Sequence, residues 1–213
     1  MSRTTLRREL ICEAAVELLA RGGGHAVSHQ AIDRHLALPA GSTSYYFRTR
    51  HALLSATIGY LTKCSRDAFE NAQPERMVTP DAASAVIASQ LVLLLHERRG
   101  HSRARYALIV ETAEDPELAG LLSGSLFSYE KAVALFRALG VHEPQQAAAD
   151  LIAVLEGLLF DRLYGRRRQS ETTTLKALQA ELERPIQLLL SGFVYDDQRH
   201  SAGTSLSSQK FRS

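Results

Sequence analysis

The stretch SHQAIDRHLALPAGSTSYYFRTRHALL, residues 28–54, decides how the chain is organised. Its first half predicts a short helix, because Ile32 and Leu36 fall at helical spacing and Ser28 occupies an N-cap position. Pro39 ends this helix and opens a second one, since its fixed φ suits a first helical turn and its missing N–H costs nothing there. The stretch therefore predicts two short helices separated by a tight break.

The second helix has the composition of a helix that enters a DNA major groove. Its exposed start carries small polar residues, which leave room for close approach to the bases, while Tyr, Arg and backbone N–H groups at its margins suit phosphates. This is the helix-turn-helix arrangement, in which we expect Ala40, Ser42 and Thr43 to face base edges and Tyr45 and Arg50 to contact phosphates. The complete predicted DNA-binding set is Ser28, His29, Pro39, Ala40, Ser42, Thr43, Ser44, Tyr45, Tyr46 and Arg50.

These residues resemble the DNA-binding signature of the TetR family of bacterial transcriptional regulators. The family pattern is Thr, then Ile-Ala, then Ala-Gly-Val-Ser-x-Gly-x-x-Tyr-x-x-Phe-x-x-Lys-x-x-Leu. The matching positions are Ser28, Ile32, Leu36-Ala37-Leu38, Gly41, Phe47, Arg50 and Leu53. The chain departs from the pattern with Asp33 for Ala, Ala37 for the turn Gly, Pro39 for Ser and Ser44 for the first Tyr. The resemblance covers about residues 5–60; the alternative, an ordinary helical hairpin with buried aromatics, leaves the basic flanks unexplained.

The charge distribution agrees with one end of the chain facing nucleic acid. Residues 1–66 carry a net charge of +5 and the remainder −3, within a total of +2. A charged stretch is usually only a solvated face, but here the basic excess coincides with the predicted helix-turn-helix.

Composition indicates a globular protein. The 213 residues are 45% hydrophobic, which is ordinary for a folded domain, and no run of eighteen apolar residues exists to span a membrane. The N-terminus lacks an apolar signal core, so we expect a cytoplasmic location. Cys12 and Cys64 stand apart from other metal-ligating residues, which favours two reduced thiols over a disulfide or redox switch.

The rest of the chain predicts helices only, and therefore an all-α fold. Apolar stripes, Gly breaks and Pro starts place helices at about 5–20, 49–71, 79–99, 100–115, 115–140, 144–165 and 174–193. The predicted domains are a helix-turn-helix head at 1–48, a ligand-binding and dimerisation body at 49–195, and a tail at 196–213 with too few apolar residues to order itself.

The last two predicted helices are candidates for a dimer face. Their apolar load also fits internal core, but in TetR-like proteins the corresponding pair builds a four-helix interface with its symmetry copy. Two heads are also needed, because one short recognition helix contacts too few base pairs to select a site from a genome. The predicted interface residues are Ile152, Leu155, Gly157, Leu159, Leu163, Leu182, Ile186 and Leu189.

The resemblance also implies a pocket for a small molecule among the helices between about 50 and 165. Most apolar residues there are needed as plain core. The residues predicted to contact a ligand are His96, Tyr106, Glu111, Phe127 and Tyr129.

The sequence contains no signature of an enzyme. It has no Gly-rich phosphate loop and no nucleophile elbow, and no His pair at i, i+4 suggests a metal site, so we predict no catalytic residue, metal or cofactor. The prediction is a homodimeric repressor that binds a palindromic operator in double-stranded DNA and is released by a small apolar or amphipathic effector. The alternatives are an activator, a regulator controlled by a protein partner, and a helical ligand-binding bundle that has lost DNA binding.

Overall fold

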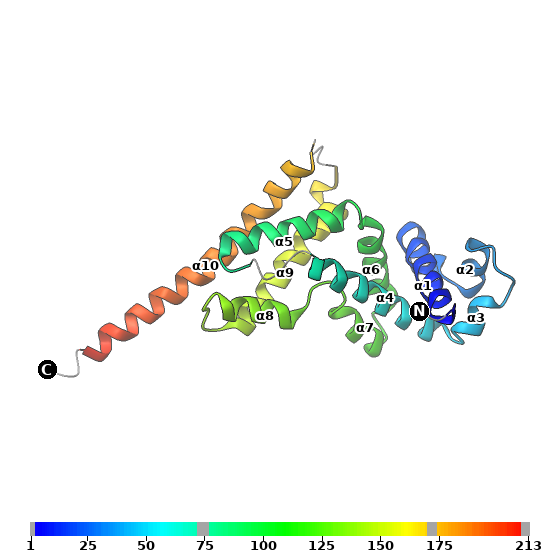
Figure 1. Ribbon diagram of the computed structural model, residues 1–213, viewed down its shortest axis with the longest axis horizontal. Helices are drawn as coiled ribbons and strands as arrows, with labels where there is room; N and C mark the ends of the chain where they lie inside the picture. Colours follow the sequence, from blue (N-terminus) through cyan, green and yellow to red (C-terminus); the bar gives the residue numbers. More distant parts are fainter. Residues whose placement is uncertain (1–2, 72–76, 170–173, 210–213) are drawn as a thin grey trace. The chain divides into compact units, whose positions relative to one another are not determined.

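The computed structural model describes residues 3–71, 77–169 and 174–209, and these are helical with no strand (Figure 1). No helix of the described residues is long and apolar enough to cross a membrane. The α-helices are α1 (Arg3–Gly22), α2 (His29–His35), α3 (Ser42–Tyr46), α4 (Arg50–Asn71), α5 (Pro80–Leu95), α6 (Arg99–Glu111), α7 (Pro116–Ser123), α8 (Tyr129–Ala138), α9 (Pro144–Leu163) and α10 (Leu175–Gln209). Two 3₁₀ turns accompany them, η1 (Gly24–Ala26) and η3 (Arg166–Gln169).

Side-chain caps fix the starts of these helices where the sequence predicts them. The Ser28 hydroxyl accepts a hydrogen bond from the Ala31 N–H at 3.1 Å and caps α2. Thr79 caps α5 in the same way, through the Ala82 N–H at 3.2 Å. Each cap satisfies a backbone donor that has no partner inside its helix, which explains why the predicted starts are accurate.

Two predicted segments differ from the structure. The helix expected at about 115–140 is divided, because α7 ends at Ser123 and Ser128 caps α8 by accepting from the Lys131 N–H at 3.3 Å. The tail expected to be unstructured from residue 196 continues α10 to Gln209. Extending an existing helix adds one hydrogen bond per residue without a new nucleation cost, so a helix can run past its last buried residue. Residues 210–213 lie outside the described part of the chain.

The chain forms two compact units. The first unit contains Met1–Phe69 and Leu93–Phe127, and the second contains Glu70–Val92 and Ser128–Ser213. In the first unit, one buried cluster includes Ile11 and Leu19 of α1, Phe47 after α3, Ile58 of α4 and Leu108 of α6. Shared burial thus joins the helix-turn-helix pair to α6 and to the Leu118 and Leu122 side chains of α7.

Both cysteines are free, as predicted. Cys12 belongs to the buried cluster of the first unit, and burial raises the pKa of its thiol to about 11. A buried thiol that is protonated at neutral pH is a poor nucleophile, so Cys12 acts as a small apolar core residue.

The second unit has its core where the sequence predicts a dimer face. Leu159 of α9 is 0% exposed within the single chain, so the prediction that it lies on an intermolecular seam is wrong. The other predicted interface residues with buried side chains are Leu155, Leu163, Leu182 and Ile186. Helix α9 is apolar on two sides, and only the structure distinguishes the inner side from the outer one.

The outer side of the same helices carries a different apolar stripe. On α9 it contains Phe160, which is 51% exposed, and Tyr164, whose ring centroid lies 5.5 Å from that of Phe160. Gly157, one turn earlier, is also exposed, whereas Ile152 and Leu189 are half-buried. On α10 the exposed large apolar side chains among the described residues are Leu175, Leu188 and Tyr195.

The turn between α2 and α3 contains a strained residue at the position where the family pattern has glycine. Ala37 has a φ of 50°, in the left-handed region that disfavours a Cβ. The Ala37 N–H donates to the Arg34 carbonyl at 3.2 Å and the Leu38 N–H to the Asp33 carbonyl at 2.8 Å. These two bonds form the Schellman motif that ordinarily ends in glycine.

Replacing Ala37 with glycine should therefore stabilise the protein. The change removes a backbone strain of about 1–2 kcal/mol from the folded state. It also costs about 0.4–1 kcal/mol of stability, because glycine has more conformational freedom in the unfolded chain. Thermal unfolding followed by circular dichroism should show a small increase in melting temperature. A decrease would mean that the alanine methyl makes a contact worth more than the strain.

Candidate nucleic-acid interface

A buried carboxylate on α2 holds the start of the recognition helix α3. The Asp33 carboxylate accepts hydrogen bonds from the Gly41 N–H at 2.8 Å, the Thr43 N–H at 2.8 Å and the Thr43 hydroxyl at 2.6 Å. Gly41 itself has a φ of 87°, which only glycine adopts without strain. Asp33 therefore caps a helix that begins nine residues after it in the chain.

The hydrogen bonds keep Asp33 ionised despite its burial. Burial alone would raise the pKa of this carboxyl group, but the Thr43 hydroxyl, the Thr43 and Gly41 N–H groups and the nearby His29 together lower it below its ordinary value. Donors directed at the charged form favour that form. The carboxylate and the positive end of α3 thus stabilise each other.

Thr43 cannot have the role that the sequence suggests for it. Its side chain is 0% exposed, because the hydroxyl points at Asp33 and away from solvent. The prediction that Thr43 faces a base edge is wrong. Asp33 was missed as a functional residue, although its departure from the small Ala of the family pattern was the available signal.

The surface that α3 presents is formed by the residues around Thr43. Tyr45 is 80% exposed, and its ring lies edge-on to that of the half-buried Tyr46 at 5.1 Å. Ser42 is half-buried, and its hydroxyl donates to the Pro39 carbonyl at 2.6 Å. The remaining predicted residues with exposed positions are Ser28, Pro39, Ala40, Ser44 and Arg50.

The end of α3 is anchored by two basic side chains. Arg8 of α1 donates to the Tyr46 carbonyl at 2.8 Å, and its guanidinium lies 4.2 Å from the centre of the Phe47 ring. The His29 ring bonds to the Phe47 carbonyl at 2.7 Å. A carbonyl only accepts, so the His29 Nε2 carries a hydrogen. Arg8 and His29 therefore position the recognition helix from within the protein.

The Arg50 side chain is 41% exposed, but its guanidinium bonds to other parts of the protein, where the sequence predicts a phosphate contact. Its guanidinium donates to the carbonyls of Val27 and Gly24, the latter at 3.0 Å, and pairs with Glu111 of α6 at 2.6 Å. A Cβ on Gly24 would collide with the Glu111 carboxylate. Arg50 thus joins the α1–α2 connection, α4 and α6. Arg48, two residues earlier, is also exposed.

The predicted ligand-binding residues do not meet in one place. Glu111 is held by Arg50, and His96 is exposed in the turn after α5. The Tyr129 hydroxyl, in the second unit, donates to the Gln145 carbonyl at 3.3 Å. Tyr106 and Phe127 are half-buried in the first unit.

The described residues offer no metal-binding cluster, since no group of three or more His, Cys, Asp or Glu among them could hold a metal ion. The arrangement consists of a short capped helix with an exposed tyrosine, small side chains and basic neighbours. These are groups that approach phosphates and base edges by hydrogen bonding and shape.

Comparisons with known proteins agree on one family. Residues 78–187, slightly more than half of the chain, match the family model described as the tetracyclin repressor-like C-terminal domain. A search of proteins with curated functions gives no significant match.

Solved structures of this type are similar in fold over most of the chain. A putative TetR-family transcriptional regulator from Mesorhizobium loti aligns with a TM-score of 0.72 at 17% identity, covering 92% of this chain and 98% of that one. A transcriptional regulator from Rhodococcus gives 0.73 at 22% identity, with 87% and 96% covered. The multidrug binding protein EbrR in complex with malachite green gives 0.66 at 21% identity, with 86% and 98% covered.

Proposed function

The chain belongs to the TetR family of transcriptional regulators, and we propose that it is a cytoplasmic, homodimeric repressor that leaves its operator when a small molecule binds. The observation that carries the DNA-binding part is the presentation of α3. Asp33 caps its start and Arg8 and His29 anchor its end, so that Tyr45 faces solvent on a fixed support. A contact surface held in place loses little conformational freedom when it binds.

The proposed contact residues follow from exposure. Ala40 and Ser44 lie on the exposed side of the recognition helix and its turn, where they can approach base edges. Tyr45 and Arg48 lie at its margin, where a phenol and a guanidinium suit phosphates. Thr43 is buried and supports this surface through Asp33, and Arg50, although exposed, is assigned to support because its guanidinium bonds to Gly24 and Glu111.

Arg48 and Arg50 give a matched test, because only two positions separate them. Arg48→Ala should weaken binding to every DNA sequence alike and lower the salt slope by about one, since one phosphate contact is lost. Arg50→Ala should leave the salt slope unchanged and lower the melting temperature, since its guanidinium serves the internal joint.

The measurement is a gel shift with the DNA upstream of the protein's own gene, repeated at several salt concentrations, together with thermal unfolding. A salt slope that responds to Arg50→Ala instead of Arg48→Ala would return Arg50 to the interface. This DNA is chosen because we propose that the operator lies upstream of the protein's own gene, and no specific binding of it by the wild-type protein would contradict that proposal.

The proposed effector is a small aromatic, apolar or amphipathic molecule. EbrR, which shares the fold, is solved with malachite green, proflavin and ethidium. In this chain the half-buried Tyr106 and Phe127 are the aromatic residues we assign to such a ligand. To release DNA, the effector must bind the non-binding conformation more tightly, because equal affinity for both conformations would shift neither population.

The proposed dimer face is the exposed stripe of α9 and α10. Dimerisation would bury the exposed side chains of Phe160, Tyr164 and Leu188 at this face. The exposed Gly157 has no side chain and lets a partner helix approach closely. A twofold partner would present the same residues. Two linked heads on a palindromic operator bind far more tightly than two separate ones.

A further inference from the structure

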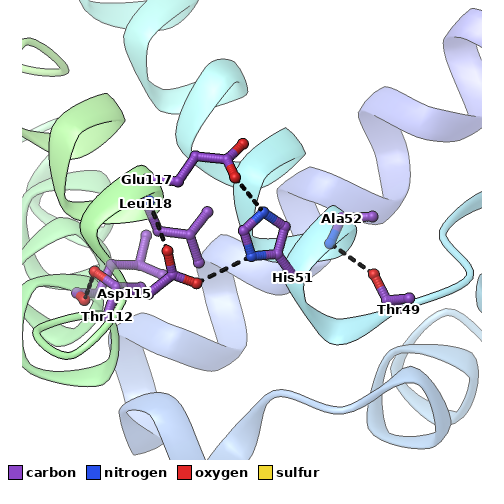
Figure 2. A network of polar contacts seen from close by, with 8 residues as sticks. Thr49, His51, Ala52, Thr112, Asp115, Glu117 and Leu118 are labelled. Atoms are coloured by element: carbon purple, nitrogen blue, oxygen red, sulfur yellow. Dashed lines mark hydrogen bonds and ion pairs between the residues drawn. The ribbon is translucent and has the colours of Figure 1, made fainter.

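His51 connects the first turn of α4 with the start of α7 (Figure 2). Its Nδ1 lies 3.0 Å from a carboxylate oxygen of Asp115, and its Nε2 lies 3.4 Å from one of Glu117. Thr49 precedes α4 and caps its first turn, since its hydroxyl accepts from the Ala52 N–H at 3.0 Å. Only Arg48 and Thr49 lie between the helical turn that His51 occupies and the Phe47 cap of α3.

This contact is complete only when the ring is protonated. An ionised carboxylate only accepts hydrogen bonds, so both ring nitrogens must carry hydrogens to bond to Asp115 and Glu117 together. A neutral imidazole has one N–H and can keep only one of the two. The bridge is therefore complete in the imidazolium form and halved in the neutral form.

Asp115, the closer acidic partner of His51, is held in place by its own hydrogen bonds. The second oxygen of Asp115 caps α7 by accepting from the Leu118 N–H at 3.1 Å, and the Asp115 N–H donates to the Thr112 carbonyl at 3.0 Å. Leu118 belongs to the same buried cluster as Phe47. A change at His51 is therefore transmitted between two anchored elements.

We propose that His51 is a proton-operated clamp between α4 and α7 that makes the presentation of the recognition helix depend on pH. The effect of this clamp on DNA binding rests on the proposed function above. The neighbouring Arg50–Glu111 pair joins α4 to α6 and serves as the constant part of the same junction, because a guanidinium stays charged throughout the physiological range. Of these two contacts, the His51 clamp is the one whose basic group changes charge near neutrality.

The charges around His51 set the direction of the response. The hydrogen bond to Asp115, then the charges of Asp115 and Glu117, raise the pKa of His51 above its ordinary value of 6.5. The Leu118 N–H and then His51 lower the pKa of Asp115, so Asp115 stays ionised. A folded-state pKa above 6.5 means that the clamp is fully formed below 6.5 and is lost as pH rises through the folded value.

The direct test is an NMR titration of the His51 imidazole in the full-length protein. We expect its midpoint above 6.5 in the wild type and closer to 6.5 in Glu117→Gln. Asp115→Asn, which retains an N-cap acceptor for α7, should also lower the midpoint. Glu114→Gln changes an exposed carboxylate next to Asp115 and should leave the midpoint unchanged. A wild-type midpoint at or below 6.5 would overturn the clamp.

The functional test compares operator binding at pH 6 and pH 8 for the wild type and His51→Gln. The wild type should lose about fivefold more affinity over this range than the variant, a coupling typical of linked sites. The comparison removes the contribution of other histidines, which both proteins share. Equal pH dependence in the two proteins would overturn the link to DNA. Failure to bind DNA at any pH would contradict the proposed function, whereas the NMR titration would still decide the clamp.

Discussion

Replacing Asp33 with asparagine should destabilise the protein and remove specific DNA binding at growth temperature. The asparagine has nearly the same shape, but its NH₂ group cannot accept a hydrogen bond, so at least one donor of Gly41 or Thr43 remains buried and unpaired. Lost hydrogen bonds to a charged acceptor and an unsatisfied donor together suggest a loss of about 2–4 kcal/mol. Chemical unfolding would measure this change.

Thr43→Val is the matched control for this variant. It removes the hydroxyl donor to Asp33 and keeps both N–H groups, so its cost should be about 1 kcal/mol. The Asp33 contribution should also depend on pH. Because the folded pKa is lowered from 3.8, the stabilisation is present above 3.8 and disappears as pH falls through the folded value. An Asp33→Asn protein as stable as the wild type would contradict the capping role.

Two adjacent residues of α9 should respond in opposite ways to the same substitution. Leu159→Glu places a charge at a position that is 0% exposed within one chain, and we expect a loss above about 4 kcal/mol and an unfolded or aggregated protein. Phe160→Glu places the charge on a side chain that is 51% exposed. It should give a folded monomer, because the charge lies beside its symmetry copy in the proposed dimer.

Sedimentation and circular dichroism separate these outcomes. Phe160→Glu should keep its helical content and lose dimerisation, and operator binding should fall with it. Leu188→Glu, on the exposed side of α10, tests the same face independently. If both variants remain folded dimers, the dimer face lies elsewhere on the molecule.

The local signals in the sequence predict helix starts well, whereas they do not predict which side of a helix faces inward. Ser28 and Thr79 cap helices as expected because capping depends on residues within one turn. The direction of Thr43 depends on Asp33, ten residues earlier, and that of Arg50 depends on Glu111, sixty-one residues later. Contacts over such separations leave no periodic trace.

The same limit explains the error in α9. Apolar residues occupy both the side with Leu159 and the side with Phe160, so periodicity alone allows either side to be the core. The sequence also did not predict the break between α7 and α8. Several serines lie near Gly124, and only the structure shows that Ser128 is the one that caps a helix.

The Arg50 joint has a consequence for how the head can be exchanged. Its guanidinium binds the main-chain oxygens of Gly24 and Val27, which every amino acid provides, and not the side chains of the residues between them. The joint is therefore indifferent to most of the sequence of that loop and demands only a missing Cβ beside Glu111. The side chains of that loop can therefore vary while the Arg50 joint is kept, whereas the buried contacts of α1 and Phe47 with α4 and α6 still restrict which heads fit this frame. Side-chain variation between Gly24 and Val27 is thus compatible with an unchanged Arg50 joint.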